Sequence, residues 1–388
     1  QYLCAAGVSF MFLVSVNRKL RENDWFKKNS IIEPNLINYL DLVSLGTVCD
    51  VVPLVGLNRA LVKQGLKILK EKKNLGLKTL LDICNVETNP SIYHLGYLLG
   101  PRINAGGRVG KCSHGANLLL NSNPKEVFRL ATELNLYNKE RQMLEKDLLE
   151  KILIKTTSIL KDPILILQGA NWHEGVIGII AARLKEKFNK PIIIISINNK
   201  IGKASARSII GFDIGSAIIS ATQEKILIKG GGHKMAAGFS IDIANIEKFK
   251  DFMFRKFKNI NEDLTQQRPL LVDSKIAPSA INLDFYEKVN ILSPFGSGNP
   301  EPKFIVENLR PVNSKIVGDN HIKSVLVGSE GTNIKTIAFN AANSEVGAYL
   351  LKKNNNTFNI AGKLSLNEWR GQKNVEFIID DISVNKNN

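Results

Sequence analysis

Residues 164–196 read ILILQGANWHEGVIGIIAARLKEKFNKPIIIIS and place a helical pattern between two short apolar runs. The runs at 164–167 and 191–196 have the length and the β-branched content of buried strands, and residues 176–188 carry apolar side chains at helical spacing. This order of strand, helix and strand predicts two parallel strands joined by a right-handed crossover. The chain therefore contains an α/β domain.

Helical patterns dominate the chain before this unit. Apolar residues at helical spacing predict helices near residues 4–21, 35–45 and 59–71. Residues 124–160 keep such spacing without Gly or Pro after the first residue, so they predict one or two long helices. A helical segment of this length would serve as a strut between domains.

The pattern changes again after the unit. Residues 229–233, KGGGH, predict a glycine-rich turn, and an amphipathic helix is expected near 246–257. Prolines spread over residues 258–302 indicate a connector. From residue 304 onward, short alternating segments predict the strands of a small barrel or sheet.

The charge balance is strongly basic in an otherwise ordinary composition. The 388 residues suit two or three domains, and 44% hydrophobic with 23% charged residues exclude a disordered or fibrous chain. The 52 Lys and Arg against 36 Asp and Glu give a net charge of +16, which favours a polyanionic partner such as nucleic acid. Part of this charge has an alternative origin. Lysines beside asparagines, as at 352–356, can also come from an AT-rich coding sequence.

The cysteines and the apolar runs bear on the compartment. Neither metal-ligand nor disulfide-framework spacing is found among Cys4, Cys49, Cys84 and Cys112, so we expect reduced core residues and a cytoplasmic location. The apolar runs are far shorter than the ~20 residues that span a bilayer, so no membrane segment is expected.

Asp50 stands alone among apolar residues in the stretch GTVCDVVPL, residues 46–54. An ionised carboxylate in such surroundings must be paired, capped or bound to a metal. From the residues alone, an N-cap or a turn residue before the following helix is the favoured interpretation, and a metal ligand is the alternative.

Arginines flank small residues in LGPRINAGGR, residues 99–108. Small residues let a backbone approach a ligand closely, and Arg102 and Arg108 could each grip a phosphate with two hydrogen bonds. We therefore expect a phosphate-binding loop, and a surface turn with solvated arginines is the competing interpretation.

Three further segments offer polar groups. His173 follows the first strand of the α/β unit, and ligands bind at the carboxyl ends of strands in open α/β sheets. A role in ligand binding and a role as a packed loop residue are equally consistent with this position. Ser205 and Arg207 supply a hydroxyl and a guanidinium for a phosphate, or belong to an exposed strand. The glycine-rich run ending at His233 exposes backbone N–H groups but is not a Walker P-loop, because no Lys-Ser/Thr pair follows it.

Taken together in this order, these segments resemble the RecJ family of single-stranded-DNA exonucleases, within the DHH phosphoesterases. Residues 46–54 are similar to its aspartate motif, 100–108 to its Gly-Pro-Arg-Ile-Asn loop, and 172–178 to the start of its DHHA1 domain. Residues 205–208 and 231–238 resemble the substrate loops of that domain. Residues 294–302, PFGSGNPEP, resemble the segment that leads into its OB-fold.

The resemblance implies a multidomain α/β architecture. It assigns the C-terminal part of a DHH domain to residues 1–122, a long helical linker to 123–160, an α/β DHHA1 domain to 161–258, a connector to 259–303 and an OB-like β-barrel to 304–388. The barrel would bind the strand with a basic groove and with aromatic residues. The available aromatics are Phe304, Phe339, Phe358 and Trp369, although core packing is the commoner role for each.

The resemblance also implies a function, namely 5′→3′ hydrolysis of single-stranded DNA in repair and recombination, with two divalent cations, Mn²⁺ or Mg²⁺. Asp50 would be a catalytic residue and a metal ligand. The expected substrate-binding residues are Arg102, Asn104, Arg108, His173, Ser205, Arg207, Gly231, Gly232 and His233.

The chain departs from the family pattern in one respect. The Asp-x-Asp and Asp-His-His motifs of the family are absent, and Asp50 alone cannot hold two metals. We therefore expect an incomplete fragment of such an exonuclease, with a non-catalytic single-stranded nucleic-acid-binding remnant as the alternative. An oligoribonuclease or a cyclic-dinucleotide phosphodiesterase is a third possibility, against which the long segment after Phe254 argues.

Overall fold

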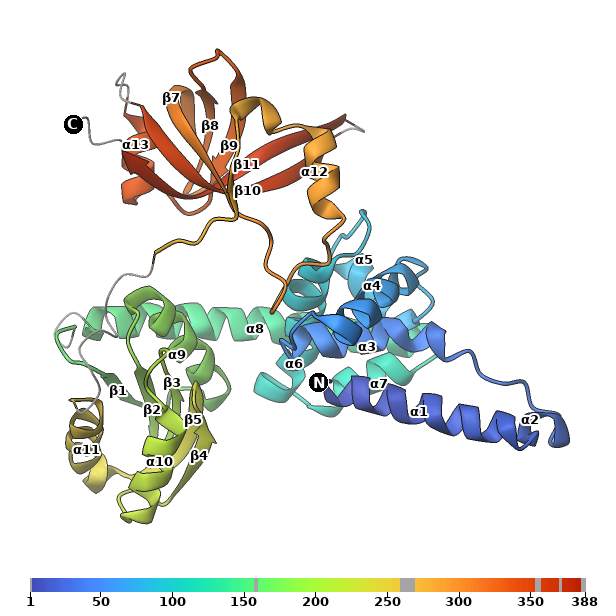
Figure 1. Cartoon of the computed structure of the whole chain (residues 1–388). Helices are drawn as coiled ribbons and strands as arrows, with labels where there is room; N and C mark the ends of the chain where they lie inside the picture. Colours follow the sequence, from blue (N-terminus) through green and yellow to red (C-terminus); the bar gives the residue numbers. More distant parts are fainter. Residues whose placement is uncertain (1, 157–159, 259–268, 353–356, 370–371, 385–388) are drawn as a thin grey trace. The chain divides into compact units, whose positions relative to one another are not determined.

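A computed structural model describes residues 2–156, 160–258, 269–352, 357–369 and 372–384 (Figure 1). The chain forms two compact units that are each discontinuous in sequence. The first unit comprises Gln1–Glu71, Pro90–Leu95 and Pro269–Asn388, and the second comprises Lys72–Asn89 and Gly96–Arg268. None of the helices in the described ranges is long and apolar enough to cross a membrane.

The second unit begins with a helical layer built on one long helix. Three helices that precede it in the chain pack on the 33-residue helix α8, Pro124–Thr156. They are α5 (Leu75–Ile83), α6 (Gly100–Val109) and α7 (Ser113–Leu120). The sequence left open one helix or two in this region, and the structure has one.

The α/β part of the second unit is a five-stranded sheet in the order β1-β2-β3-β5-β4. The strands are β1 (Leu165–Ala170), β2 (Ile192–Asn198), β3 (Ile201–Arg207), β4 (Lys229–His233) and β5 (Ala236–Asp242). β1 and β2 are parallel and joined by helix α9, Glu174–Phe188, which confirms the predicted crossover unit. The other pairs are antiparallel.

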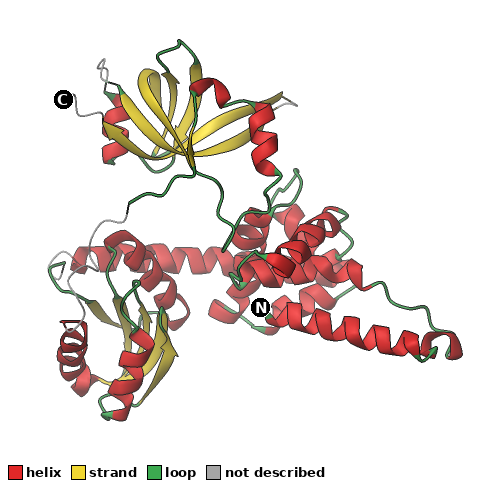
Figure 2. Cartoon of the chain, in the orientation of Figure 1, coloured by secondary structure: helices red, strands yellow, loops and turns green. Residues whose placement is uncertain are grey.

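Alternation along β2 explains why helices cover both faces of this sheet (Figure 2). Ile192 and Ile194 are buried against α8 and α9. Ile193 and Ile195 are buried on the other face, against α10 (Ile214–Gln223) and α11 (Ile246–Lys258). Successive side chains of a strand point to opposite faces, so a continuous isoleucine run suits a strand between two helical layers.

The first unit opens with helices α1 (Ala5–Glu22), α2 (Trp25–Lys28), α3 (Leu40–Cys49) and α4 (Gly56–Lys70), with a 3-10 turn η1 (Leu36–Tyr39) before α3. These confirm the helices expected near 4–21, 35–45 and 59–71. α3 and α4 approach closely at Gly65, where a Cβ would lie 2.1 Å from the carbonyl oxygen of Leu40.

Helix α1 is unusual because large apolar side chains are exposed around it. Their exposed fractions run from 36% at Val14 to 67% at Phe12. The others are Val8, Met11, Leu13 and Val16. A helix that is apolar on most sides is normally buried.

The rest of the first unit holds a closed barrel of five strands. They are β7 (Phe304–Val317), β8 (His321–Val327), β9 (Asn333–Ala338), β10 (Phe358–Trp369) and β11 (Gln372–Val384). β10 pairs with both β11 and β7, which closes the barrel and confirms the expected OB-like fold. Helix α13, Glu345–Leu351, packs on β7, β8 and β11.

The expected connector 259–303 has structure where it is described, from residue 269 onward. β6, Ser274–Lys275, pairs with β7, and α12, Leu283–Asn290, packs on β10 and β11. The stretch PFGSGNPEP is anchored to the segment after α3, because Leu54 N donates to Ser297 O at 2.6 Å.

The aromatic residues that the sequence offered for stacking on a DNA strand, with core packing as the commoner role of each, have different positions. Phe304 and Phe358 are buried in the barrel core, so packing occupies both rings. Phe339 is exposed. The side chain of Trp369 lies outside the described part of the chain.

Candidate functional site

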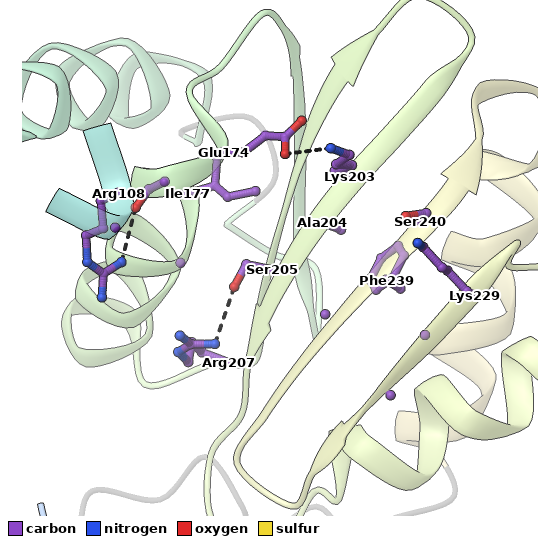
Figure 3. A pocket seen from close by; sticks show the side chains of 16 residues that line it. Arg108, Glu174, Ile177, Lys203, Ala204, Ser205, Arg207, Lys229, Phe239 and Ser240 are labelled. Atoms are coloured by element: carbon purple, nitrogen blue, oxygen red, sulfur yellow. Dashed lines mark hydrogen bonds and ion pairs between the residues drawn. The ribbon is translucent and has the colours of Figure 1, made fainter. Parts of the chain in front are cut away.

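A pocket of about 680 Å³ lies in the second unit, over β3, β5 and β4 and beside the first turns of α9 (Figure 3). Four of the residues expected to bind substrate line it, from three separate segments of the chain. They are Arg108, Ser205, Arg207 and Gly231. The pocket is therefore the place where the sequence motifs converge.

Ser205 and Arg207 belong to strand β3, which agrees with the strand that the residues left open and not with the loop that the resemblance implied. They are two residues apart and share one face of the strand. Arg207 Nη1 donates to Ser205 Oγ at 3.3 Å and to Ala206 O at 2.9 Å. Gly178 of α9 leaves room for both, because a Cβ there would lie 3.0 Å from Ser205 Oγ and 3.3 Å from Arg207 Nη2.

Arg108 reaches the pocket from the last turn of helix α6, so the expected loop at 99–108 is wrong. Pro101 occupies the first turn of this helix, where a missing N–H costs nothing. Arg108 Nη1 donates to the carbonyl oxygen of Gly175 at 3.1 Å. A Cβ on Gly175 would lie 2.4 Å from Arg108 O, so this glycine allows α6 and α9 to meet.

The electrostatics of the pocket favour an anion. Burial lowers the pKa of Arg207, and the nearby positive charge of Arg108 lowers it further. Among the described residues, neither guanidinium contacts a carboxylate. A phosphate placed between them would relieve this repulsion and accept charge-assisted hydrogen bonds.

Other charged groups at the pocket were not expected from the sequence. Lys203 forms an ion pair with Glu174 at 2.8 Å, and Lys229 is exposed at the far side of the pocket lining. Lys203 lies on the same face of β3 as Ser205 and Arg207, as Figure 3 shows. Strand alternation from Arg207 backward could have identified it.

The glycine-rich run at 229–233 pairs with β5 and is strand β4. The expected turn is therefore wrong. Gly231 faces the pocket, and a Cβ there would have no described atom within 4 Å. Gly232 is needed for pairing, since its Cβ would lie 2.4 Å from Ala236 O. His233 is exposed, and its Nδ1 accepts from Met235 N at 3.4 Å.

The remaining expected substrate contacts lie outside the pocket lining. Arg102 donates to Asn135 Oδ1 at 3.0 Å and to Leu98 O at 2.8 Å, so its guanidinium holds α6 against α8. Asn104 is exposed on α6. His173 is the N-cap of α9, where its Nδ1 accepts from Gly175 N at 3.1 Å.

Asp50 belongs to the first unit and ends helix α3 as its C-cap residue. Asp50 does not cap the next helix, because the N-cap of α4 is Val55, but it lies in the turn before that helix, as the other half of this interpretation expected. Asp50 is exposed, so water satisfies its charge despite the apolar neighbours in sequence. Within the described ranges, no group of three or more His, Cys, Asp or Glu could hold a metal ion, so these residues do not fit a two-metal centre.

Comparison with known proteins decides the family. Two sequence signatures match, the DHHA1 domain over residues 161–259 and the RecJ OB domain over residues 272–381. The single-stranded-DNA-specific exonuclease RecJ of Salmonella typhimurium is 33% identical over 395 residues, covering 98% of this chain and 67% of that protein. The chain belongs to the RecJ family.

Other RecJ proteins agree. The RecJ of Escherichia coli is 34% identical, and the chain again spans 67% of its length. The crystal structure of RecJ from Thermus thermophilus in complex with Mn²⁺ matches with a TM-score of 0.77 and 29% identity, covering 92% of this chain and 51% of that one. The OB-domain match also supports a RecJ protein over the shorter phosphodiesterases considered above.

Proposed function

We propose that this chain carries the strand-binding part of a single-stranded-DNA-specific exonuclease that degrades DNA from its 5′ end. The observation that supports this is the pair Arg108 and Arg207, which face one pocket without a carboxylate partner among the described residues, in a chain of the RecJ family. The fold keeps the two positive charges of Arg108 and Arg207 close enough to repel each other, and a bound anion would offset that repulsion.

Each pocket residue has a definite task in this proposal. Arg207 and Arg108 grip a backbone phosphate of the strand, and the Ser205 hydroxyl donates to the same phosphate. Gly231 keeps that side of the pocket free of side chains so that the sugar–phosphate backbone can approach. Lys229 adds charge that attracts DNA of any sequence. None of these contacts reads a base, which suits an enzyme without sequence preference.

The cation requirement is a separate part of the proposal. The Thermus RecJ structures contain Mn²⁺ or Mg²⁺, and we infer that cleavage here also needs a divalent cation. Asp50 would be one ligand. The described residues do not supply the others, so we assign no catalytic step to this chain alone.

Binding of a 5′-phosphorylated oligothymidylate, measured by fluorescence anisotropy, tests the pocket. Arg207→Ala removes charge-assisted hydrogen bonds worth about 1.5–3 kcal/mol and should weaken binding about tenfold or more. Arg255→Ala removes the same charge from an exposed position on α11 of the same unit and is the matched control. Equal affinity in both variants would remove Arg207 from the site.

Incubation of the same strand with Mn²⁺ separates the exonuclease from the non-catalytic alternative. Progressive shortening of the labelled strand from its 5′ end supports an exonuclease. Salt-dependent binding without shortening supports a nucleic-acid-binding module, because counterion release accompanies binding with or without cleavage.

A further inference from the structure

Glu145 lies on the long helix α8 and contacts helix α9, whose first turns line the pocket. Its side chain is 2% exposed, and its carboxylate sits between two guanidiniums. Oε2 lies 3.0 Å from Arg141 Nη1, one turn earlier on α8, and Oε1 lies 2.6 Å from Arg183 Nε on α9. The carboxylate therefore forms ion pairs with both helices from a buried position, and the contact of Oε1 with Arg183 is an ion pair without regular hydrogen-bond geometry.

Arg141 depends on this carboxylate. Its side chain is only 12% exposed, and its Nη2 donates to Asn138 Oδ1 at 3.0 Å. Its Nε is buried without a hydrogen-bond partner among the residues that the structure describes. Burial lowers the pKa of Arg141, Glu145 opposes this, and the charges of Arg108 and Arg183 add to the lowering. A buried charge in this state costs free energy unless an anion compensates it.

Arg108 connects this cluster with the pocket. Its charge lowers the pKa of Arg141 on α8 and of Arg207 in the pocket. It also contacts the first turn of α9 through Gly175, and α9 carries Arg183 two turns further on. Helix α9 is thus held at its start by Arg108, beside the pocket, and further along by Glu145 through Arg183.

We propose that Glu145 is a positioning residue for the phosphate pocket. By binding Arg141 and Arg183 it keeps α9 against α8, and it leaves Arg108 and Arg207 as the unpaired guanidiniums that face the ligand. Without this carboxylate, the charge of Arg141 is uncompensated and repels Arg108 from its position at α9. The inference rests on the proposed role of the pocket in binding phosphate.

The test uses a small ligand, thymidine 5′-monophosphate, and isothermal titration with the full 388-residue chain. Glu145→Gln keeps the shape of the side chain and makes the protein more positive by one charge. Simple electrostatics therefore predicts tighter binding, whereas loss of positioning predicts weaker binding. Couplings of this kind change affinity by about 5- to 150-fold, and we expect about tenfold weaker binding. Glu140→Gln makes the same charge change at an exposed position of α8 and should not weaken binding.

A second variant guards against a folding defect. Arg183 is 55% exposed, so Arg183→Gln should fold even if Glu145→Gln does not, and it should weaken the same binding. Because both residues act through one contact, the double variant should be no weaker than Glu145→Gln alone. Normal ligand affinity in the folded variants, even with a lower melting temperature, would overturn the positioning role.

The failure of this inference is distinguishable from failure of the proposed function. If Arg207→Ala loses the nucleotide while Glu145→Gln and Arg183→Gln keep it, the pocket stands and the positioning role falls. If the wild-type chain does not bind the nucleotide, or Arg207→Ala binds it equally well, the phosphate pocket falls and the positioning role falls with it.

Discussion

Arg108 and Gly175 are in contact through both side chain and backbone. The Arg108 side chain donates to Gly175 O at 3.1 Å, and Arg108 O lies so close to the Gly175 Cα that a Cβ there would be 2.4 Å from it. The end of helix α6 and the start of helix α9 are thereby joined beside the pocket. Backbone proximity, rather than a large side-chain contact, sets this part of the site.

The first prediction follows from that contact. Gly175→Ala should displace α6 or α9, because its Cβ would lie 2.4 Å from Arg108 O. Overpacking of this kind costs about 1–3 kcal/mol, so we expect a lower melting temperature together with weaker binding of 5′-phosphorylated strands. Gly107→Ala is the control, since its Cβ would be in ordinary contact, 3.8 Å from Cys112 Cβ. A Gly175→Ala variant as stable as the control would contradict the close approach.

The second prediction concerns Lys229. This exposed lysine at the pocket should attract phosphates without selecting a position on the strand. Lys229→Ala should weaken binding for all single strands alike and reduce the slope of log affinity against log salt by about 0.7. Lys200→Ala, at an exposed position of the β2–β3 turn, should leave the slope unchanged. An identical slope in the two variants would place Lys229 outside the path of the DNA.

The third prediction concerns the buried carboxyl group of Asp41 in the first turn of α3. Burial raises the pKa of Asp41, and a backbone hydrogen bond from Leu42 N at 2.7 Å opposes this only partly. The resulting stability is fully present below the pKa of the unfolded chain and is lost as pH rises through the raised folded value. Asp41→Asn should therefore increase the melting temperature at neutral pH and reduce its change between about pH 4 and 7.

Asp319→Asn, in an exposed turn of the same unit, is the comparison for Asp41→Asn, because it removes the same charge without removing a buried group. A decrease in the neutral-pH melting temperature of Asp41→Asn alone would show that the Asp41 carboxylate stabilises the fold in its ionised form.

The fourth prediction concerns thiol reactivity. Burial raises the pKa of Cys49 to about 11, with a smaller contribution from the charge of Asp50, whereas Cys112 is exposed. Because the thiolate is the reactive form, an alkylating reagent at pH 8 should label Cys112 first and Cys49 slowly. Mass spectrometry of a time course gives the order. Labelling of Cys49 at the rate of Cys112 would show that the half-buried position of Cys49 does not keep its thiol protonated.

The architecture was predictable where a periodic pattern extends over many residues. The isoleucine run of β2 and the apolar stripe of α9 gave the parallel crossover unit, and the alternation after residue 304 gave the barrel. The α6 and β4 predictions failed for a common reason. Both segments are rich in glycine, which favours loops locally, yet both are regular in the structure, where α6 packs on α8 and β4 pairs with β5.

The candidate site was predictable only in part. Ser205 and Arg207 stand close in sequence, so their joint role was visible. The exposure of Asp50 was not, because apolar neighbours in sequence say little about which side of a helix end faces water. The link between Glu145 and Arg183 joins residues 38 positions apart and depends on how α8 crosses α9, which no local pattern encodes.

The exposed apolar surface of α1 has a practical consequence for every salt titration suggested above. Such surface favours self-association, and the net charge of +16 opposes it by repulsion between molecules. Added salt screens that repulsion over a Debye length of about 10 Å at 0.1 M. Colloidal stability and DNA affinity should therefore decline over the same range of ionic strength, so light scattering recorded beside each titration would separate released DNA from aggregated protein.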